Sequence, residues 1–167
     1  MNTTSRQAEE FIYHESRLLD ERKFDEWLNL FTKSGIYWIP IDENADPASS
    51  PSITYDDSSL REQRVYQLMN LPHYAQIPPS RTVHILTNIT VDNEAYESQP
   101  LIARCNMLVF ELRPGDPLQF GLGEQRSFVG HCEYRLEQNE PNQLFIAMKK
   151  IVLINRDLPI SNLSFIL

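Results

Sequence analysis

The order of two hydrophobic periodicities constrains the fold of this 167-residue chain more than any other feature. Its first third repeats apolar residues at helical spacing, whereas its second half alternates apolar and polar residues over four long stretches. These stretches cover residues 83–92, 101–112, 127–137 and 144–155. A run of helices followed by a run of strands is typical of an α+β domain with an antiparallel sheet. We therefore predict one α+β domain that spans residues 1–167.

Three helices are expected in the first half of the chain. The apolar stripe of the first helix is formed by Ala8, Phe11, Ile12, Leu18 and Leu19. Glu15 lies within that stripe and is its only acidic member. A second helix is expected over residues 24–31. A third is expected over about residues 59–69, where a capping-box pattern begins at Ser59. Between the second and third helices, residues 36–41 predict a short aromatic strand.

The last predicted strand, residues 144–155, carries apolar side chains on both faces. One face is predicted to hold Leu144, Ile146, Met148, Val152 and Ile154. The other is predicted to hold Phe145, Ala147, Ile151 and Leu153. A sheet with one face in water should alternate more cleanly than this. Because three short helices cover only one face, we expect a partner subunit to cover the other.

Charge and composition exclude several classes of function. Fifteen basic residues against 23 acidic ones give a net charge of −8, which disfavours binding to a phosphate backbone. No apolar run is long enough to span a membrane, so neither nucleic acid nor membrane is expected as a partner. Two cysteines, Cys105 and Cys132, cannot form a disulfide framework and fit a reducing compartment. We expect a cytoplasmic protein.

The sequence holds no motif for a metal or a cofactor. The four histidines, at positions 14, 73, 84 and 131, are not spaced as zinc ligands, and the two cysteines cannot hold an iron–sulfur cluster. If the chain were an enzyme, Glu15 and His84 would be the candidates for moving protons. The alternative is that each is a hydrogen-bonded structural residue.

Several short motifs occur in a specific order along nearly the whole chain. They are LLDERKFDEWL at residues 18–28, YWIP at 37–40, YDD at 55–57, PSRT at 79–82 followed by His84 and Asn88, and NLS at 162–164. In this order they resemble the beta (small) subunits of aromatic-ring-hydroxylating dioxygenases, which belong to the Rieske non-haem iron oxygenases.

This resemblance implies both a fold and a role. The fold would be a cone-shaped, curved antiparallel (mixed) sheet wrapped around about three N-terminal helices, as in nuclear-transport-factor-two-like and ketosteroid-isomerase-like proteins. The role would be that of a non-catalytic assembly subunit in an oxidoreductase that dihydroxylates aromatic compounds with electrons from NAD(P)H. Three alpha and three beta subunits would form the terminal oxygenase. The alpha subunit would hold the Rieske cluster and the mononuclear iron.

The motifs also suggest which residues face a partner. We expect five charged or aromatic side chains to cluster and either face the alpha subunit or brace the loop that does. They are Tyr55, Asp56, Asp57, Arg64 and Arg81.

The alternative function is a stand-alone, cofactor-free enzyme of the same cone fold, of the isomerase or dehydratase type, acting on a small hydrophobic molecule through Glu15 or His84. The aromatic substrate stays open.

Overall fold

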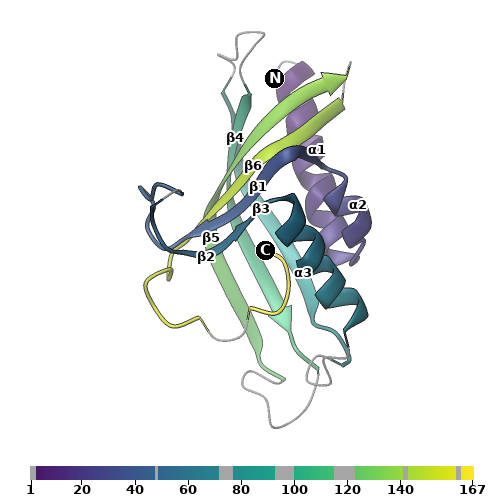
Figure 1. Cartoon of the computed structure of the whole chain (residues 1–167), viewed down its shortest axis with the longest axis vertical. Helices are drawn as coiled ribbons and strands as arrows, with labels where there is room; N and C mark the ends of the chain where they lie inside the picture. The colour runs from purple at the N-terminus through teal and green to yellow at the C-terminus, as the bar shows by residue number, and fades with distance from the viewer. Residues whose placement is uncertain are drawn as a thin grey trace.

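The computed structural model contains one curved sheet with three helices packed against one of its sides (Figure 1). It describes residues 3–47, 49–71, 77–92, 100–114, 123–140, 143–160 and 163–167. The helices are α1 (Thr3–Asp20), α2 (Phe24–Leu28) and α3 (Ser58–Asn70). The strands are β1 (Phe31–Pro40), β2 (Ser52–Asp56), β3 (Arg81–Val91), β4 (Leu101–Leu112), β5 (Gln125–Glu140) and β6 (Gln143–Leu153).

The sheet is mixed, with strand order β2-β1-β6-β5-β4-β3. Neighbouring strands are antiparallel except for β1 and β6, which run parallel. We call the face that carries the helices the inner face and the opposite one the outer face. The prediction of an α+β fold with a curved mixed sheet and three helices is confirmed.

Aromatic packing joins the helices to the inner face. Trp27 of α2 is fully buried, and its ring meets those of Phe31 and Tyr37 edge to face, with centroids 5.0 and 5.8 Å apart. Such pairs add about 0.5–1.5 kcal/mol beyond the burial of their area. The apolar stripe of α1 is buried as its spacing predicts, and Glu15 is buried with it at 1% exposure.

Element boundaries differ from the prediction around the second and third helices. The helix predicted over residues 24–31 ends at Leu28, because the chain joins the sheet at once: the Leu30 carbonyl accepts a hydrogen bond from Ile146 N–H of β6 at 2.8 Å. The expected capping role of Ser59 was wrong. Asp57 caps α3 by accepting the Leu60 N–H at 2.9 Å. None of the described helices is both long and apolar enough to cross a membrane.

Two irregularities reverse the alternation of faces within a strand. In β3 the pairing with β4 shifts between Thr87 and Thr90, where Asn88 takes a left-handed φ of 54°. In β6 the pairing with β5 shifts beside Ala147. The predicted faces of residues 144–155 were therefore wrong. Beyond this bulge the inner side chains are Lys149, Ile151 and Leu153, which are buried, while Met148, Val152 and Ile154 belong to the outer face.

We expect the left-handed backbone conformation at Asn88 to limit which residues can replace it. Asn88→Val should lower the free energy of unfolding by about 1–2 kcal/mol, because a β-branched residue is strained in the left-handed region. Asn88→Gly should change it by less than about 0.5 kcal/mol. Urea denaturation of both variants tests this. Thr90→Val, on the same strand with an ordinary backbone, is the control, and an equal loss in Thr90→Val would contradict the bulge as the cause.

Candidate functional site

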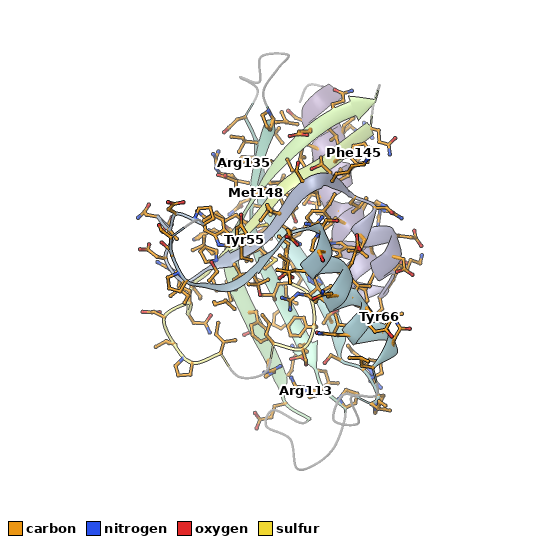
Figure 2. All side chains as sticks on the ribbon, viewed as in Figure 1. Tyr55, Tyr66, Arg113, Arg135, Phe145 and Met148 are labelled. Carbon is orange, nitrogen blue, oxygen red and sulfur yellow. The ribbon has the colours of Figure 1, made fainter. Side chains whose placement is uncertain are left out.

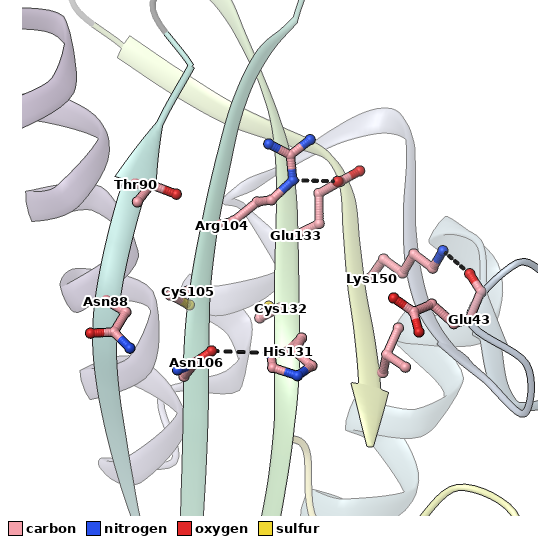
Figure 3. Close-up of a pocket in the computed structure, with 11 residues that line it drawn as sticks. Glu43, Asn88, Thr90, Arg104, Cys105, Asn106, His131, Cys132, Glu133 and Lys150 are labelled. Atoms are coloured by element: carbon pink, nitrogen blue, oxygen red, sulfur yellow. Dashed lines mark hydrogen bonds and ion pairs between the residues drawn. The ribbon is translucent and has the colours of Figure 1, made fainter. Parts of the chain in front are cut away.

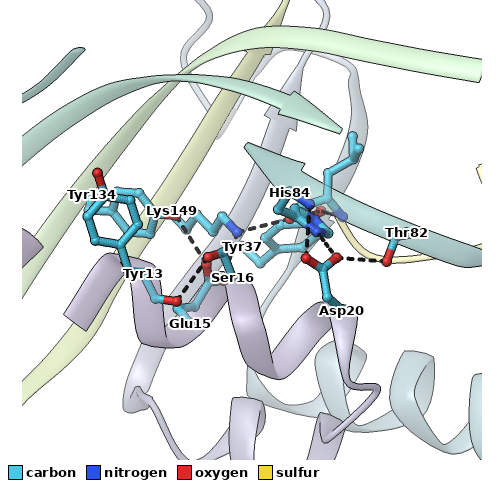
Figure 4. Close-up of polar contacts among 10 residues, drawn as sticks. Tyr13, Glu15, Ser16, Asp20, Tyr37, Thr82, His84, Tyr134 and Lys149 are labelled. Carbon is cyan, nitrogen blue, oxygen red and sulfur yellow. Dashed lines mark hydrogen bonds and ion pairs between the residues drawn. The ribbon is translucent and has the colours of Figure 1, made fainter. Parts of the chain in front are cut away.

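Glu15 is the centre of a buried polar network on the inner face of the sheet (Figure 4). Its Oε1 lies 2.7 Å from Lys149 Nζ of β6. The indole N–H of Trp27 donates to the same oxygen at 2.7 Å, and the hydroxyl of Tyr134 donates to Oε2 at 3.1 Å. Donors from α2, β5 and β6 thus converge on one carboxylate. This is the geometry of a buried, fully paired ion, not of an acid that faces a substrate.

The residue that the sequence analysis missed here is Lys149. Its side chain is 1% exposed, and its ammonium lies 5.6 Å from the ring centroid of Tyr134 and 6.0 Å from that of Tyr37. Lysine is almost never buried without a partner, so a lysine in a strand is normally expected to face solvent. The apolar residues around it at 144–155 therefore did not predict that Lys149 points to the inner face. Only the bulge beside Ala147 turns it inward.

The last described residues lie against the inner face and close the network. Lys149 Nζ donates to the main-chain oxygen of Leu167 at 3.0 Å. The N–H of Leu167 donates to the hydroxyl of Tyr37 at 3.1 Å. Burial raises the pKa of this hydroxyl, which therefore stays protonated at neutral pH. Phe165 packs edge to face on Phe128, with ring centroids 5.3 Å apart. Leu167 is thus bonded to both Lys149 and Tyr37 on the inner face.

His84, the second candidate proton carrier, forms a pair with Asp20 at the end of α1 (Figure 4). Its Nδ1 lies 2.6 Å from Asp20 Oδ1, its main-chain N–H donates to Oδ2 at 3.0 Å, and the Thr82 hydroxyl donates to Oδ1 at 3.0 Å. Burial by itself raises the pKa of Asp20, but the hydrogen bonds from His84 and Thr82 outweigh it and leave the pKa below its ordinary value. The imidazole is 1% exposed, and its Nε2 is buried without a hydrogen-bond partner among the described residues. This pair fastens α1 to β3.

Four of the five residues expected at a subunit interface lie in the segment from the end of β2 into α3. Arg64 of α3 pairs with both oxygens of Asp56, at 2.5 and 3.0 Å. Asp57 caps α3, and Tyr55 is 39% exposed with its ring edge to face on that of Trp38. Arg81 begins β3, at the other end of the strand order from β2, and pairs with Leu112 of β4. The structure brings Asp56, Asp57 and Arg64 together at the start of α3, with Tyr55 next to them in the chain.

Two of the motifs meet instead at a buried carboxylate, that of Glu111. Ser80 of the PSRT motif donates to its Oε1 at 2.6 Å, and Arg126 Nε donates to its Oε2 at 2.8 Å. Arg113 lies 3.5 Å from Oε1 and donates to the hydroxyl of Ser164, in the NLS motif, at 3.2 Å. Glu111 and Arg113 are 0% and 1% exposed. The sequence analysis missed both residues, since contacts between residues so far apart in the chain leave no local pattern.

The outer face carries an open, polar hollow of about 480 Å³ across β3, β4, β5 and β6 (Figure 3). Arg104 pairs with Asp92 at 2.6 Å and with Glu133 at 3.0 Å. His131 Nδ1 lies 3.0 Å from Asn106 Oδ1. These groups are half-exposed, so the pairs add little to the stability of the isolated chain.

The described residues do not fit a metal centre. No group of three or more His, Cys, Asp or Glu side chains is placed to hold an ion in that part of the chain. Cys105 and Cys132 are cross-strand neighbours on β4 and β5, but His84 is paired with Asp20, and His131 lies on the outer face. Burial raises the pKa of the Cys132 thiol well above its ordinary value, which disfavours the thiolate that a cluster needs. His73 lies outside the described residues.

Comparison with known proteins gives a consistent result. The family described as the ring hydroxylating beta subunit matches residues 14–159. The small oxygenase component of the p-cumate 2,3-dioxygenase system of Pseudomonas putida is 30% identical over 153 residues, which is 90% of this chain and 79% of that protein. The beta subunit of benzene 1,2-dioxygenase of Pseudomonas putida is 27% identical over 169 residues, covering 95% of this chain and 86% of that protein.

A solved structure shows the same fold. The beta subunit of the benzoate 1,2-dioxygenase of Burkholderia mallei superposes with a TM-score of 0.70 at 23% identity. The superposition covers 99% of this chain and 98% of that one.

Lys149→Met should lower the free energy of unfolding by about 3–5 kcal/mol, because it leaves the Glu15 carboxylate buried without its counter-charge. The double variant Glu15→Gln, Lys149→Met should regain more than half of that loss. Urea denaturation measures both. Lys150→Met is the control, since the ammonium of Lys150 is on the outer face and should contribute less than about 1 kcal/mol. A Lys149→Met effect as small as that of the control would contradict the network's structural role.

Proposed function

Because the chain belongs to the family of ring hydroxylating beta subunits, we propose that it is the structural small subunit of an aromatic-ring dioxygenase. It acts in the cytoplasm and assembles the terminal oxygenase of three alpha and three beta subunits. The alpha subunits carry out the dihydroxylation of an aromatic compound. They hold the Rieske cluster and the mononuclear iron, for which the described part of this chain has no fitting ligands.

One observation carries the structural role. The only acid in the inner stripe of α1 is already paired. Lys149, Trp27 and Tyr134 occupy the oxygens of Glu15, and Leu167 lies beside them. A general acid or base needs a free proton site within reach of a substrate. The stand-alone isomerase or dehydratase is therefore not favoured, since its Glu15 would have to break a buried ion pair before each turnover.

The outer face supports self-association into a trimer. Six apolar side chains lie next to one another on this face. Five are on the paired strands β3, β4 and β5, and the sixth directly follows the end of β6. We call this set the outer apolar band: Val83, Ile85, Leu108, Phe110, Val129 and Ile154. Val83 and Ile154 are 55% and 61% exposed in the isolated chain. A second copy of the same chain would bury this band, and closed rings are the usual outcome of such contacts.

The helical side is left for the alpha subunit. Asp56 and Arg64 form a partly buried pair that fixes the start of α3 beside the exposed ring of Tyr55. We place Tyr55, Asp56, Asp57 and Arg64 at or behind the surface that the alpha subunit contacts. Arg81, at the start of β3, would contact it separately.

The test of the proposed function is His84→Asn in the assembled oxygenase. Turnover normalised to intact complex should stay within about threefold of wild type, whereas loss of a true general acid or base costs about 10²–10⁴-fold. The substitution keeps a hydrogen-bond donor for Asp20, so the complex should still form. A hundredfold fall in turnover with assembly intact would refute the structural role. So would a wild-type chain that binds no alpha subunit.

A second prediction concerns the outer apolar band. Light scattering of the isolated chain should give three times its 19.5 kDa mass, and Ile85→Asp should give a monomer. Tyr13→Asp, on α1 and similarly exposed, is the control and should stay trimeric. A wild-type mass near 19.5 kDa would contradict self-association through this band.

A further inference from the structure

The end of α3 borders a hollow, lined by both apolar and polar side chains, that the structural role described so far does not use. It measures about 170 Å³ and lies between α3, the turn after α1 and the chain before β3. We call it the end-of-helix groove: Leu68, Met69, Leu71, Ile77 and Pro79, with Arg22, Ser80 and Ser164 at its margin. Met69 and Ile77 are 51% and 59% exposed. Tyr66, one turn before Met69, is 58% exposed and points away from the sheet (Figure 2).

Arg22 brings an uncompensated charge to this groove. Its guanidinium lies 5.2 Å from the ring centroid of Phe24, and its Nη2 lies 3.9 Å from Met69 Sδ. Burial lowers its pKa, and no acidic group among the described residues acts against that effect. Arg64 and Arg104, in contrast, pair with Asp56 and with Asp92 and Glu133. A half-buried cation beside apolar side chains and without a carboxylate is costly in the isolated chain.

The backbone at Arg22 shows a second cost. The N–H groups of Arg22 and Lys23 donate to the carbonyls of Leu19 and Leu18, at 3.1 and 2.8 Å, which is the Schellman pattern at the end of α1. Arg22 therefore takes the left-handed position, with φ 57°, where glycine is preferred. Arg22 thus combines a left-handed backbone with a guanidinium that contacts Phe24 and Met69 but no carboxylate among the described residues.

We propose that the end-of-helix groove is a docking site for the alpha subunit, which inserts an apolar side chain between Met69 and Ile77 and pairs a carboxylate with Arg22. This rests on the proposed function. The occupant supplies an anion, because the guanidinium of Arg22 contacts Phe24 and Met69 but no carboxylate among the described residues. Arginine, methionine and aromatic residues are also enriched at the centres of protein interfaces, where removal of a single side chain can greatly weaken binding. The outer apolar band is a separate surface, and it stays available for the second copy of this chain.

Two variants test the groove in the full-length chain. Arg22→Gly removes the cation and relieves the left-handed strain, so the free energy of unfolding should stay close to that of wild type. Met69→Asp places a charge in the groove at an exposed position. Binding of the purified alpha subunit, with its own cofactors, to the immobilised chain should show a Kd raised about 10- to 100-fold in each variant. Tyr13→Asp, outside the groove, should bind as wild type does.

Each outcome is decisive. Weakened binding of both variants, with their trimeric mass unchanged, supports the groove as the alpha-subunit site. Wild-type affinity in both variants overturns it while the proposed function stands. Loss of the trimer instead of alpha-subunit binding would show that a second copy occupies the groove, which also overturns it. A wild-type chain that binds no alpha subunit refutes the proposed function itself.

Discussion

The ion pair between Glu15 and Lys149 is the interaction on which the interior of this protein depends. It joins the first helix to the last strand across 134 positions of the chain, and it lies where neither charge reaches water. Two buried charges are tolerated only when each is neutralised and hydrogen-bonded. The elements that supply the remaining hydrogen bonds, α2, β1 and β5, must therefore sit in one arrangement. Trp27, Tyr37 and Tyr134 fix that arrangement through their polar tips and pack the core with their rings.

This network also explains how a fold can support assembly without catalysis. In a cone-shaped fold the inner face is the natural place for a pocket, because helices and sheet diverge there. Here Lys149, Trp27 and Tyr134 are all paired with Glu15, and Leu167 is bonded to Lys149. Two features at the surface lack a partner of matching chemistry among the described residues: the outer apolar band, and Arg22 at the end-of-helix groove, which has no carboxylate beside it. Unpartnered groups at the surface favour binding to other chains rather than chemistry on a small molecule.

Local patterns in the sequence predicted the elements well where packing agrees with periodicity. The strand at Leu101–Leu112 and the inner face of β5 follow their alternation, because every second side chain is buried against the inner side of the sheet. The pattern failed at residues 29–31, where pairing with β6 overrides helix propensity, and at Ala147, where a bulge reverses the faces. A bulge depends on the partner strand, and no window of one strand contains that information.

The sequence by itself determined the class of the fold, the lack of metal-binding motifs and the resemblance to a family of small subunits, since all three depend on periodicity, residue type and the order of motifs. Only the tertiary structure decided what the polar residues do. It turned Glu15 from a candidate acid into the counter-charge of Lys149, joined His84 to Asp20, and paired Arg64 with Asp56. The physical reason is that the energy of a charge depends on its partners and on its distance from water, and both are set by contacts between residues far apart in the chain.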